Sequence, residues 1–187
     1  MRLFVAINLP PETKHDVAGA IEPLRAAAPE LTWVREDRLH LTLKFLDEQP
    51  EEMVNRLQEA LADVAARHRE LIMDLHGVGA FPNFRRARVV WMGIEPEGRL
   101  ELLHHDVEIV CHELGFEVEG RPFRPHLTLA RVKRPLDEPS ARALARAAKT
   151  IDFQTEVVVH SIDLMRSELS SSGSSYSTLV SAPLRSR

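Results

Sequence analysis

The tetrapeptide His-Leu-Thr-Leu occurs at residues 40–43 and again at residues 126–129. Successive side chains of a β-strand point to opposite faces, so each copy would place its histidine and threonine on one face and its leucines on the other. If the leucines enter the core, each strand offers one imidazole and one hydroxyl on its polar face. The repeat therefore predicts either two ordinary strands with solvent-facing histidines or one site built from both histidines.

The segments around the two copies show helix and strand patterns in a mixed order. Apolar side chains at helical spacing predict helices that begin near Pro10 and Pro50, and further helices over 100–114 and 140–149. Strand-forming runs predict strands at 3–8, 31–34, 39–46, 71–81, 89–94, 116–118, 153–160, 162–166 and 177–181. Such a mixture without strict alternation is typical of an α+β fold with largely antiparallel sheets.

The composition is that of an ordinary globular chain. The 187 residues are 44% hydrophobic and 28% charged, and they fit one compact domain or two closely packed lobes. No linker-like stretch marks a boundary, so we expect a single bilobal domain over 1–187. The net charge of −4 disfavours electrostatic binding of nucleic acid over the whole surface, so any phosphate site must be a local patch of positive charge.

The sequence also indicates the cellular compartment in which the protein resides. Cys111 is the only cysteine, which excludes an intramolecular disulfide and a cysteine-rich zinc site and suits a reducing compartment. The apolar stretch at the N-terminus is too short for a signal-peptide core. No apolar run approaches the roughly 20 residues that a membrane-spanning helix needs. We therefore expect a soluble, cytoplasmic protein with no membrane partner.

Two imidazoles that face one cleft suit a particular reaction. Each can hold or release a proton near neutral pH. Opening a cyclic phosphodiester needs a base that deprotonates the attacking water and an acid that protonates the departing ribose oxygen, and one histidine on each side supplies both without a metal. Threonine hydroxyls and an arginine can stabilise charge on the non-bridging oxygens.

Five stretches of the chain, in order, carry a resemblance to a known family. They are RLFVAINLP (2–10), WVREDRLHLTLKFLDE (33–48), GVGAFPNFRRARVVWMGI (77–94), GFEVEGRPFRPHLTLARV (115–132) and LMRSELSSSGSSYSTL (164–179). The paired His-x-Thr motifs resemble those of the two-histidine (2H) phosphoesterase superfamily. The sequence around the motifs is similar to that of its RNA 2′,3′-cyclic phosphodiesterase branch, whose members are also described as 2′-5′ RNA ligases.

The resemblance implies a fold and an activity. The fold is bilobal and pseudo-twofold, with two mainly antiparallel sheets facing a central cleft and helices on the outer faces. The activity is metal-independent hydrolysis of RNA 2′,3′-cyclic phosphate ends, such as those of tRNA fragments, to 2′-phosphomonoesters, with reversible 2′-5′ joining as a side activity. The implied protein is a monomer that needs no cofactor.

The resemblance also implies roles for individual residues. His126 matches the general base on water, and His40 matches the general acid on the O3′ leaving group. The implied substrate-binding residues are Thr42, Thr128, Arg131, which contacts phosphate, and Phe45, which stacks on the terminal base. Phe45 and Arg131 lie an odd number of residues from their histidines, so we expect a bulge or strand end near Lys44 and Ala130 to bring them to the histidine face. The first motif departs from the family at Asp47, where glycine is commoner.

Two other functions stay open at this point. One keeps the scaffold but acts on a small cyclic nucleotide, either a nucleoside 2′,3′-cyclic phosphate or ADP-ribose 1″,2″-cyclic phosphate. The other is a non-catalytic module that binds RNA ends. Several polar groups are interpreted as solvated features rather than ligands: Lys44, the helical stripe His104, Glu108 and His112, and the loop arginines Arg85, Arg86 and Arg88. The alternative for Lys44, which has the strand parity of His40, is a position near the phosphate, and the alternative for the loop arginines is contact with an RNA backbone.

Overall fold

The computed structural model describes residues 1–187. Its strands are β1 (Arg2–Asn8), β2 (Thr32–Trp33), β3 (His40–Glu48), β4 (Leu71–Phe81), β5 (Val89–Ile94), β6 (His126–Arg131), β7 (Gln154–Val159), β8 (Ser161–Ser170) and β9 (Gly173–Pro183). Its α-helices are α1 (Pro11–Ala20), α2 (Glu22–Ala27), α3 (Glu52–Ala66), α4 (Gly98–Glu113) and α5 (Glu138–Lys149), and its 3-10 helices are η1 (Glu36–Arg38) and η2 (Phe84–Arg86). None of the helices is long and apolar enough to cross a membrane.

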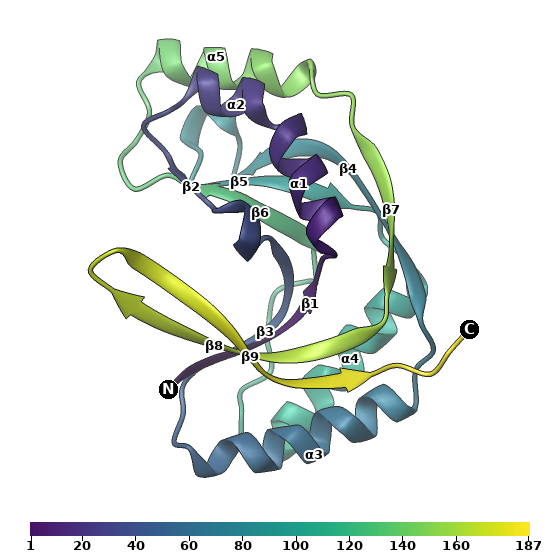
Figure 1. Cartoon of the computed structure of the whole chain (residues 1–187). Coiled ribbons are helices and arrows are strands. Elements are labelled where there is room, and N and C mark those ends of the chain that lie inside the picture. The colour runs from purple at the N-terminus through teal and green to yellow at the C-terminus, as the bar shows by residue number, and fades with distance from the viewer.

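The strands form one curled antiparallel sheet in which the two HLTL strands are central neighbours (Figure 1). The order is β7-β4-β5-β6-β3-β1-β8-β9, and β2 pairs with β6 beside this path. β3 and β6 meet at a single register pair, in which Leu41 lies opposite Leu127. These are the second residues of the two HLTL tetrapeptides. The α+β class is therefore confirmed, and the two expected sheets are the two halves of this sheet on either side of the β3–β6 seam.

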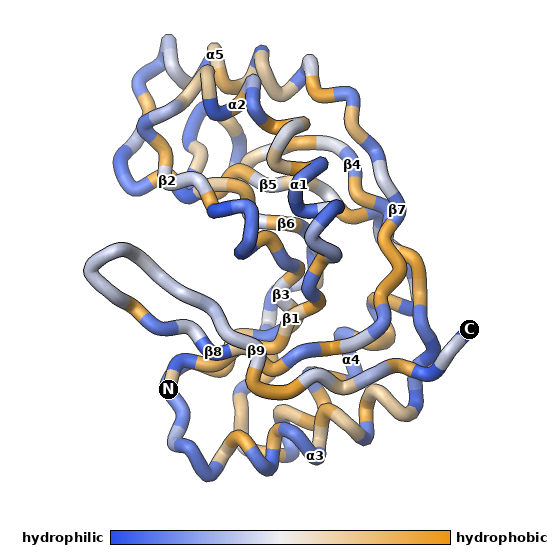
Figure 2. Tube along the Cα trace, viewed as in Figure 1, coloured by the Kyte–Doolittle hydropathy of each residue, from blue (hydrophilic) through white to orange (hydrophobic).

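Apolar packing explains why the helices lie where they do. α3 packs against α4, and α2 packs against α5, and the two pairs lie at opposite ends of the molecule (Figure 1). In α3 the side chains of Leu57, Leu61 and Val64 are buried at helical spacing, as the sequence predicts. Apolar residues follow the strands of both halves (Figure 2), and one core cluster of 39 buried residues contains side chains from both.

Each HLTL strand contains a β-bulge at the same position, the second leucine of the tetrapeptide. In β3, Lys44 lies opposite Val5 and Thr42 lies opposite Ala6, so Leu43 is an extra residue. A bulge turns the following side chains to the other face. Leu43 and Lys44 are consequently both buried, and Phe45 emerges with 63% of its surface exposed.

The second strand repeats this arrangement. In β6, Ala130 pairs with Val90 and Thr128 pairs with Trp91, so Leu129 is the extra residue. Leu129 and Ala130 are both buried, and the next residue, Arg131, is exposed. The bulges that the sequence required near Lys44 and Ala130 are therefore confirmed.

Two expected strands differ from the structure. The strand at 116–118 is wrong, because residues 114–125 form an irregular connection between α4 and β6. Its backbone bonds to side chains instead: the Glu117 carbonyl accepts from Lys44 Nζ at 2.5 Å, and the Glu119 amide donates to Glu108 at 3.2 Å. The β8–β9 hairpin is longer than expected, since both strands extend to a two-residue turn before Gly173, which has a φ of 112°.

Asp47 is the only non-glycine residue with a positive φ, at 55°. This is the position where the resembling sequences more often carry glycine. An aspartate tolerates the left-handed region better than most side chains, because its short polar group can bond locally. The departure from the motif at Asp47 therefore leaves the end of β3 in the same turn conformation that a glycine would adopt.

Candidate active site

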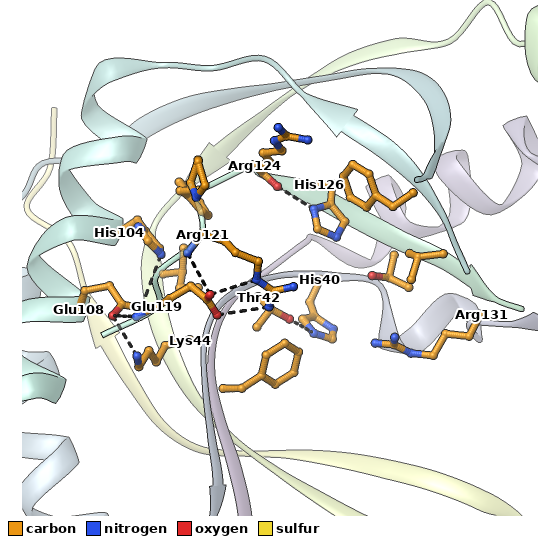
Figure 3. A pocket seen from close by; sticks show the side chains of 17 residues that line it. His40, Thr42, Lys44, His104, Glu108, Glu119, Arg121, Arg124, His126 and Arg131 are labelled. Atoms are coloured by element: carbon orange, nitrogen blue, oxygen red, sulfur yellow. Dashed lines mark hydrogen bonds and ion pairs between the residues drawn. The ribbon is translucent and has the colours of Figure 1, made fainter. Parts of the chain in front are cut away.

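The two motif histidines are held in the same way. Nδ1 of His40 lies 2.7 Å from the Arg38 carbonyl oxygen, and Nδ1 of His126 lies 2.7 Å from the Arg124 carbonyl oxygen. A carbonyl oxygen can only accept, so Nδ1 donates in both rings, and in the neutral form Nε2 carries the free lone pair. Both rings line one cavity of about 580 Å³ (Figure 3). The pair therefore presents two potential proton acceptors to one space.

The surroundings of the two rings differ. Nε2 of His40 lies 3.0 Å from the Thr42 hydroxyl, whereas Nε2 of His126 makes no hydrogen bond. The His40 ring packs against Phe4 at a centroid distance of 5.0 Å, and the His126 ring meets Phe81 edge-on at 5.2 Å. The structure thus leaves one histidine engaged with its own motif and the other free toward the cavity.

Burial sets the charge state of both imidazoles. It lowers the pKa of His40 and of His126 from the usual 6.5, because a partly buried ring loses hydration of its charged form. The backbone carbonyl at each Nδ1 opposes this shift in pKa, and the charge of Arg131 adds to it in both rings. The lowered pKa values favour the neutral form of both imidazoles in the free protein.

All of the residues predicted for the site lie together around this cavity. They are His40, Thr42, Phe45, His126, Thr128 and Arg131. Strand alternation places the threonines beside their histidines, and the paired bulges bring Phe45 and Arg131 to the same side. The structure therefore joins two segments that lie far apart in the sequence into one constellation.

Lys44 and Glu108 contradict their interpretation as solvated residues. Both are buried, at 7% and 6% exposure, and Lys44 Nζ donates to Glu108 Oε2 at 2.9 Å. The bulge at Leu43 turns the lysine inward, and α4 presents the glutamate to it. Sequence reasoning missed this pair because it uses the expected bulge to turn Phe45 and keeps Lys44 on the face of His40.

The helical stripe that contains Glu108 is only partly solvated. His104 lies with Nε2 3.8 Å from Glu108 Oε1, and its ring stacks on Phe123 with the centroids 3.8 Å apart. His112 is exposed and bonds to the Phe116 carbonyl. His104, Glu108 and Phe123 all line the cavity behind the histidine pair, and nowhere in residues 1–187 do three or more His, Cys, Asp or Glu side chains form a metal-binding group.

Two arginine groups lie in different settings. Arg121 points into the cavity from the loop before β6, where its Nε donates to Glu119 at 3.1 Å (Figure 3). The loop arginines Arg85, Arg86 and Arg88 are exposed and do not line the cavity. Sequence reasoning did not single out Arg121 as a site residue, although it belongs to the stretch that leads into the second motif.

Comparison with known proteins places the chain in a family. The model of the 2′-5′ RNA ligase superfamily matches residues 10–170. A protein of Geobacillus stearothermophilus named RNA 2′,3′-cyclic phosphodiesterase is 32% identical over 97% of this chain, and the match covers 56% of that relative. One of the same name from Archaeoglobus fulgidus is 34% identical, with 96% of this chain and 98% of the relative covered.

A solved structure supports the fold. The crystal structure of the protein TT0787 of Thermus thermophilus matches with a TM-score of 0.82 and 32% identity, over 100% of both chains. The present chain spans about half of the Geobacillus relative and nearly all of the Archaeoglobus one. With a family model that matches most of its length, the chain belongs to the 2′-5′ RNA ligase superfamily.

Proposed function

We propose that this protein hydrolyses the 2′,3′-cyclic phosphate ends of RNA to 2′-phosphomonoesters by paired-histidine acid–base catalysis. The observation that carries the proposal is the matched carbonyl support of His40 and His126, which leaves two Nε2 atoms at one cavity. The names of the relatives support the substrate class.

The two histidines have opposite tasks in this reaction. His126 Nε2 removes a proton from water, whose oxygen forms a bond to phosphorus. The bond between phosphorus and O3′ breaks, and protonated His40 gives its proton to O3′. The free Nε2 of His126 supports its role as the base, and the hydrogen bond between His40 Nε2 and the Thr42 hydroxyl supports a fixed position for the acid.

Neutral and charged donors around the pair complete the proposed site. The hydroxyls of Thr42 and Thr128 and the guanidinium of Arg131 bind the non-bridging oxygens, where they stabilise the charge that develops during displacement. An RNA 5′-hydroxyl that replaces water as the nucleophile would give a 2′-5′ bond by the same proton transfers. Reversible 2′-5′ joining of RNA ends is therefore part of the proposal, because it uses the same proton transfers as hydrolysis.

The test is a turnover assay in EDTA with an RNA that ends in a 2′,3′-cyclic phosphate and, separately, with a nucleoside 2′,3′-cyclic phosphate. We expect a 2′-phosphomonoester product from the RNA. Turnover of the mononucleotide alone would favour the small-nucleotide function, turnover of neither would leave only an RNA-end-binding module, and loss of activity in EDTA would contradict the mechanism.

Substitution of either histidine should abolish turnover. His40→Ala and His126→Ala each remove one half of the proton transfer, so we expect a loss of at least about a hundredfold in kcat/KM. His15→Ala is the matched control, because His15 is exposed and does not line the cavity. Circular dichroism checks the fold of all three variants. Substantial activity in either motif variant would show that the acid–base assignment is wrong.

A further inference from the structure

The cleft continues beyond the histidine pair. A second cavity of about 840 Å³ shares His40, Thr42, Phe45, Thr128 and Arg131 with the first and extends along the β8–β9 hairpin. Figure 1 shows this hairpin as a yellow arm that projects from the sheet. Each cavity lies in the size range of sites that hold one drug-sized ligand, and the second reaches residues of the hairpin that the first does not, so the cleft offers room beyond the histidine pair.

The hairpin end of the cleft exposes an aromatic ring beside the one predicted to stack on the terminal base. Tyr176 is 38% exposed and Phe45 is 63% exposed, and both line the second cavity. Both rings pack on the buried Phe4, with centroid distances of 5.2 Å and 6.5 Å. Two exposed rings around one buried ring are two platforms on which successive bases can stack.

Unpaired positive charge lies next to the second platform. The Arg38 guanidinium is 5.8 Å from the centre of the Tyr176 ring, and neither Arg38 nor Arg2, which also lines this cavity, forms an ion pair. An arginine beside an aromatic ring is the usual combination for a nucleotide in single-stranded RNA, because one binds phosphate and the other stacks on the base. The carboxylates of Asp47, Glu117 and Glu119 also line this cavity, and Glu119 is paired with Arg121. Attraction for phosphate therefore depends on individual unpaired arginines rather than on a general positive charge.

We infer that the hairpin end of the cleft binds the nucleotide that precedes the cyclic phosphate, with its base on Tyr176 and its phosphate at Arg38. The inference rests on the proposed function for the position of the terminal nucleotide. It makes the preferred substrate an RNA end of at least two nucleotides. The competing explanation is that Tyr176 only supports the His40 ring, which it meets edge-on at 5.5 Å.

The first experiment compares two substrates in each variant. We measure kcat/KM for a dinucleotide that ends in a 2′,3′-cyclic phosphate and for the corresponding mononucleotide, and we follow the ratio. Base–aromatic stacking corresponds to roughly five- to hundredfold in binding, so the wild type should prefer the dinucleotide by an amount in this range. Tyr176→Leu should remove most of the preference, Tyr176→Phe should retain it, and Leu179→Ala, on the same strand but outside both cavities, should also retain it.

The second experiment uses salt to test Arg38. The slope of log(kcat/KM) against log[salt] is negative, and the loss of one phosphate contact on a single strand should reduce its magnitude by roughly 0.7. Arg38→Gln should show this change with the dinucleotide and not with the mononucleotide. Arg35→Gln is the control, because Arg35 lies on the same turn, pairs with Asp37 and lines neither cavity. The substitution at Arg38 leaves the carbonyl that supports His40 in place.

Several outcomes would overturn the inference while the proposed function stands. Equal hydrolysis of both substrates would show that no second nucleotide binds. Equal loss on both substrates in Tyr176→Leu would show that the tyrosine only positions His40. An effect of Tyr176→Leu confined to the joining of a separate 5′-hydroxyl oligonucleotide would assign this end of the cleft to the incoming strand. Failure of the proposed function itself would instead appear as no turnover of either substrate by the wild type.

Discussion

A backbone carbonyl, rather than a carboxylate, orients each imidazole of the pair. A carboxylate at Nδ1 would favour the imidazolium strongly, whereas a neutral carbonyl fixes the ring and leaves burial and nearby charge to decide protonation. At His40 and His126 these influences lower the pKa. Arg131, which we propose binds phosphate, contributes to this shift, so its two effects on turnover can be separated by pH.

The pH profile of kcat/KM should therefore respond to Arg131. In the proposed mechanism the productive free enzyme has one neutral and one protonated histidine, so we expect its population to peak between the two pKa values, both of which are lowered from the usual 6.5. Removing the positive charge makes both imidazolium forms less unfavourable and raises both pKa values. Arg131→Gln should lower the peak, because a phosphate contact is lost, and should also move it to higher pH. A profile that falls in height without moving, or that moves to lower pH, would contradict this prediction.

Sequence reasoning predicted, for a physical reason, most of the residues that gather in the candidate site. His40, Thr42, His126 and Thr128 follow directly from strand alternation, which is a local property. Phe45 and Arg131 required a bulge in each strand, and both bulges are present. Lys44 shows the limit of such reasoning, because the face that the lysine takes depends on which residue of β3 is the extra one, and the pairing with β1 decides that.

At the scale of elements, the pair of Lys44 and Glu108 joins β3 to α4 and also holds the loop before β6. A buried ion pair contributes little over apolar groups of the same size, but removing one partner leaves an uncompensated charge. This asymmetry makes the pair testable by the free energy of unfolding.

We expect Lys44→Met to lower the free energy of unfolding by about 3–5 kcal/mol, because it removes the lysine charge that compensates the buried Glu108 carboxylate and leaves the Glu119 amide as its hydrogen-bond donor. The double variant Lys44→Met, Glu108→Gln should recover most of this loss. Arg142→Met, which removes one partner of an exposed pair with Glu138, is the control and should change stability by less than about 0.5 kcal/mol. Urea unfolding followed by circular dichroism measures all three, and similar losses at positions 44 and 142 would be inconsistent with a buried role for the lysine.

The elements that the sequence reveals are those with one apolar face. The helices α3, α4 and α5 and the β4–β5 hairpin carry such a face, and they were predicted close to their observed bounds. The outer part of the β8–β9 hairpin is exposed on both faces from Glu168 to Leu179, apart from Ser174, so no alternation marks it as strand. Its cross-strand hydrogen bonds alone define it. The irregular segment 114–125 was missed for the opposite reason, since distant side chains satisfy its backbone.

At the scale of the whole molecule, the chain order interlaces the two halves of the sheet. β3 and β4 follow each other in the chain through α3, yet β4 lies beside β5 in the other half. β7 and β8 are likewise consecutive in the chain, but β8 returns to pair with β1. The β3–β6 seam has only one register pair, so the shared core rather than hydrogen bonding joins the halves. We therefore propose that residues 1–187 fold as one domain.

A substitution in one half should then be detected from the other. Both tryptophans, Trp33 in β2 and Trp91 in β5, lie in the half that contains β6, so their fluorescence reports on that half alone. Leu164 is fully buried in β8 of the opposite half. Leu164→Ala should lower the free energy of unfolding by about 2–5 kcal/mol, through lost apolar transfer and the cavity left behind. In a single cooperative unit, the tryptophan transition must shift by the same amount as the far-ultraviolet circular dichroism transition.

Leu102→Ala, at an exposed leucine of α4, controls for the change of side chain. A tryptophan transition that stays at its original denaturant concentration while the dichroism transition moves would show that the two halves unfold independently.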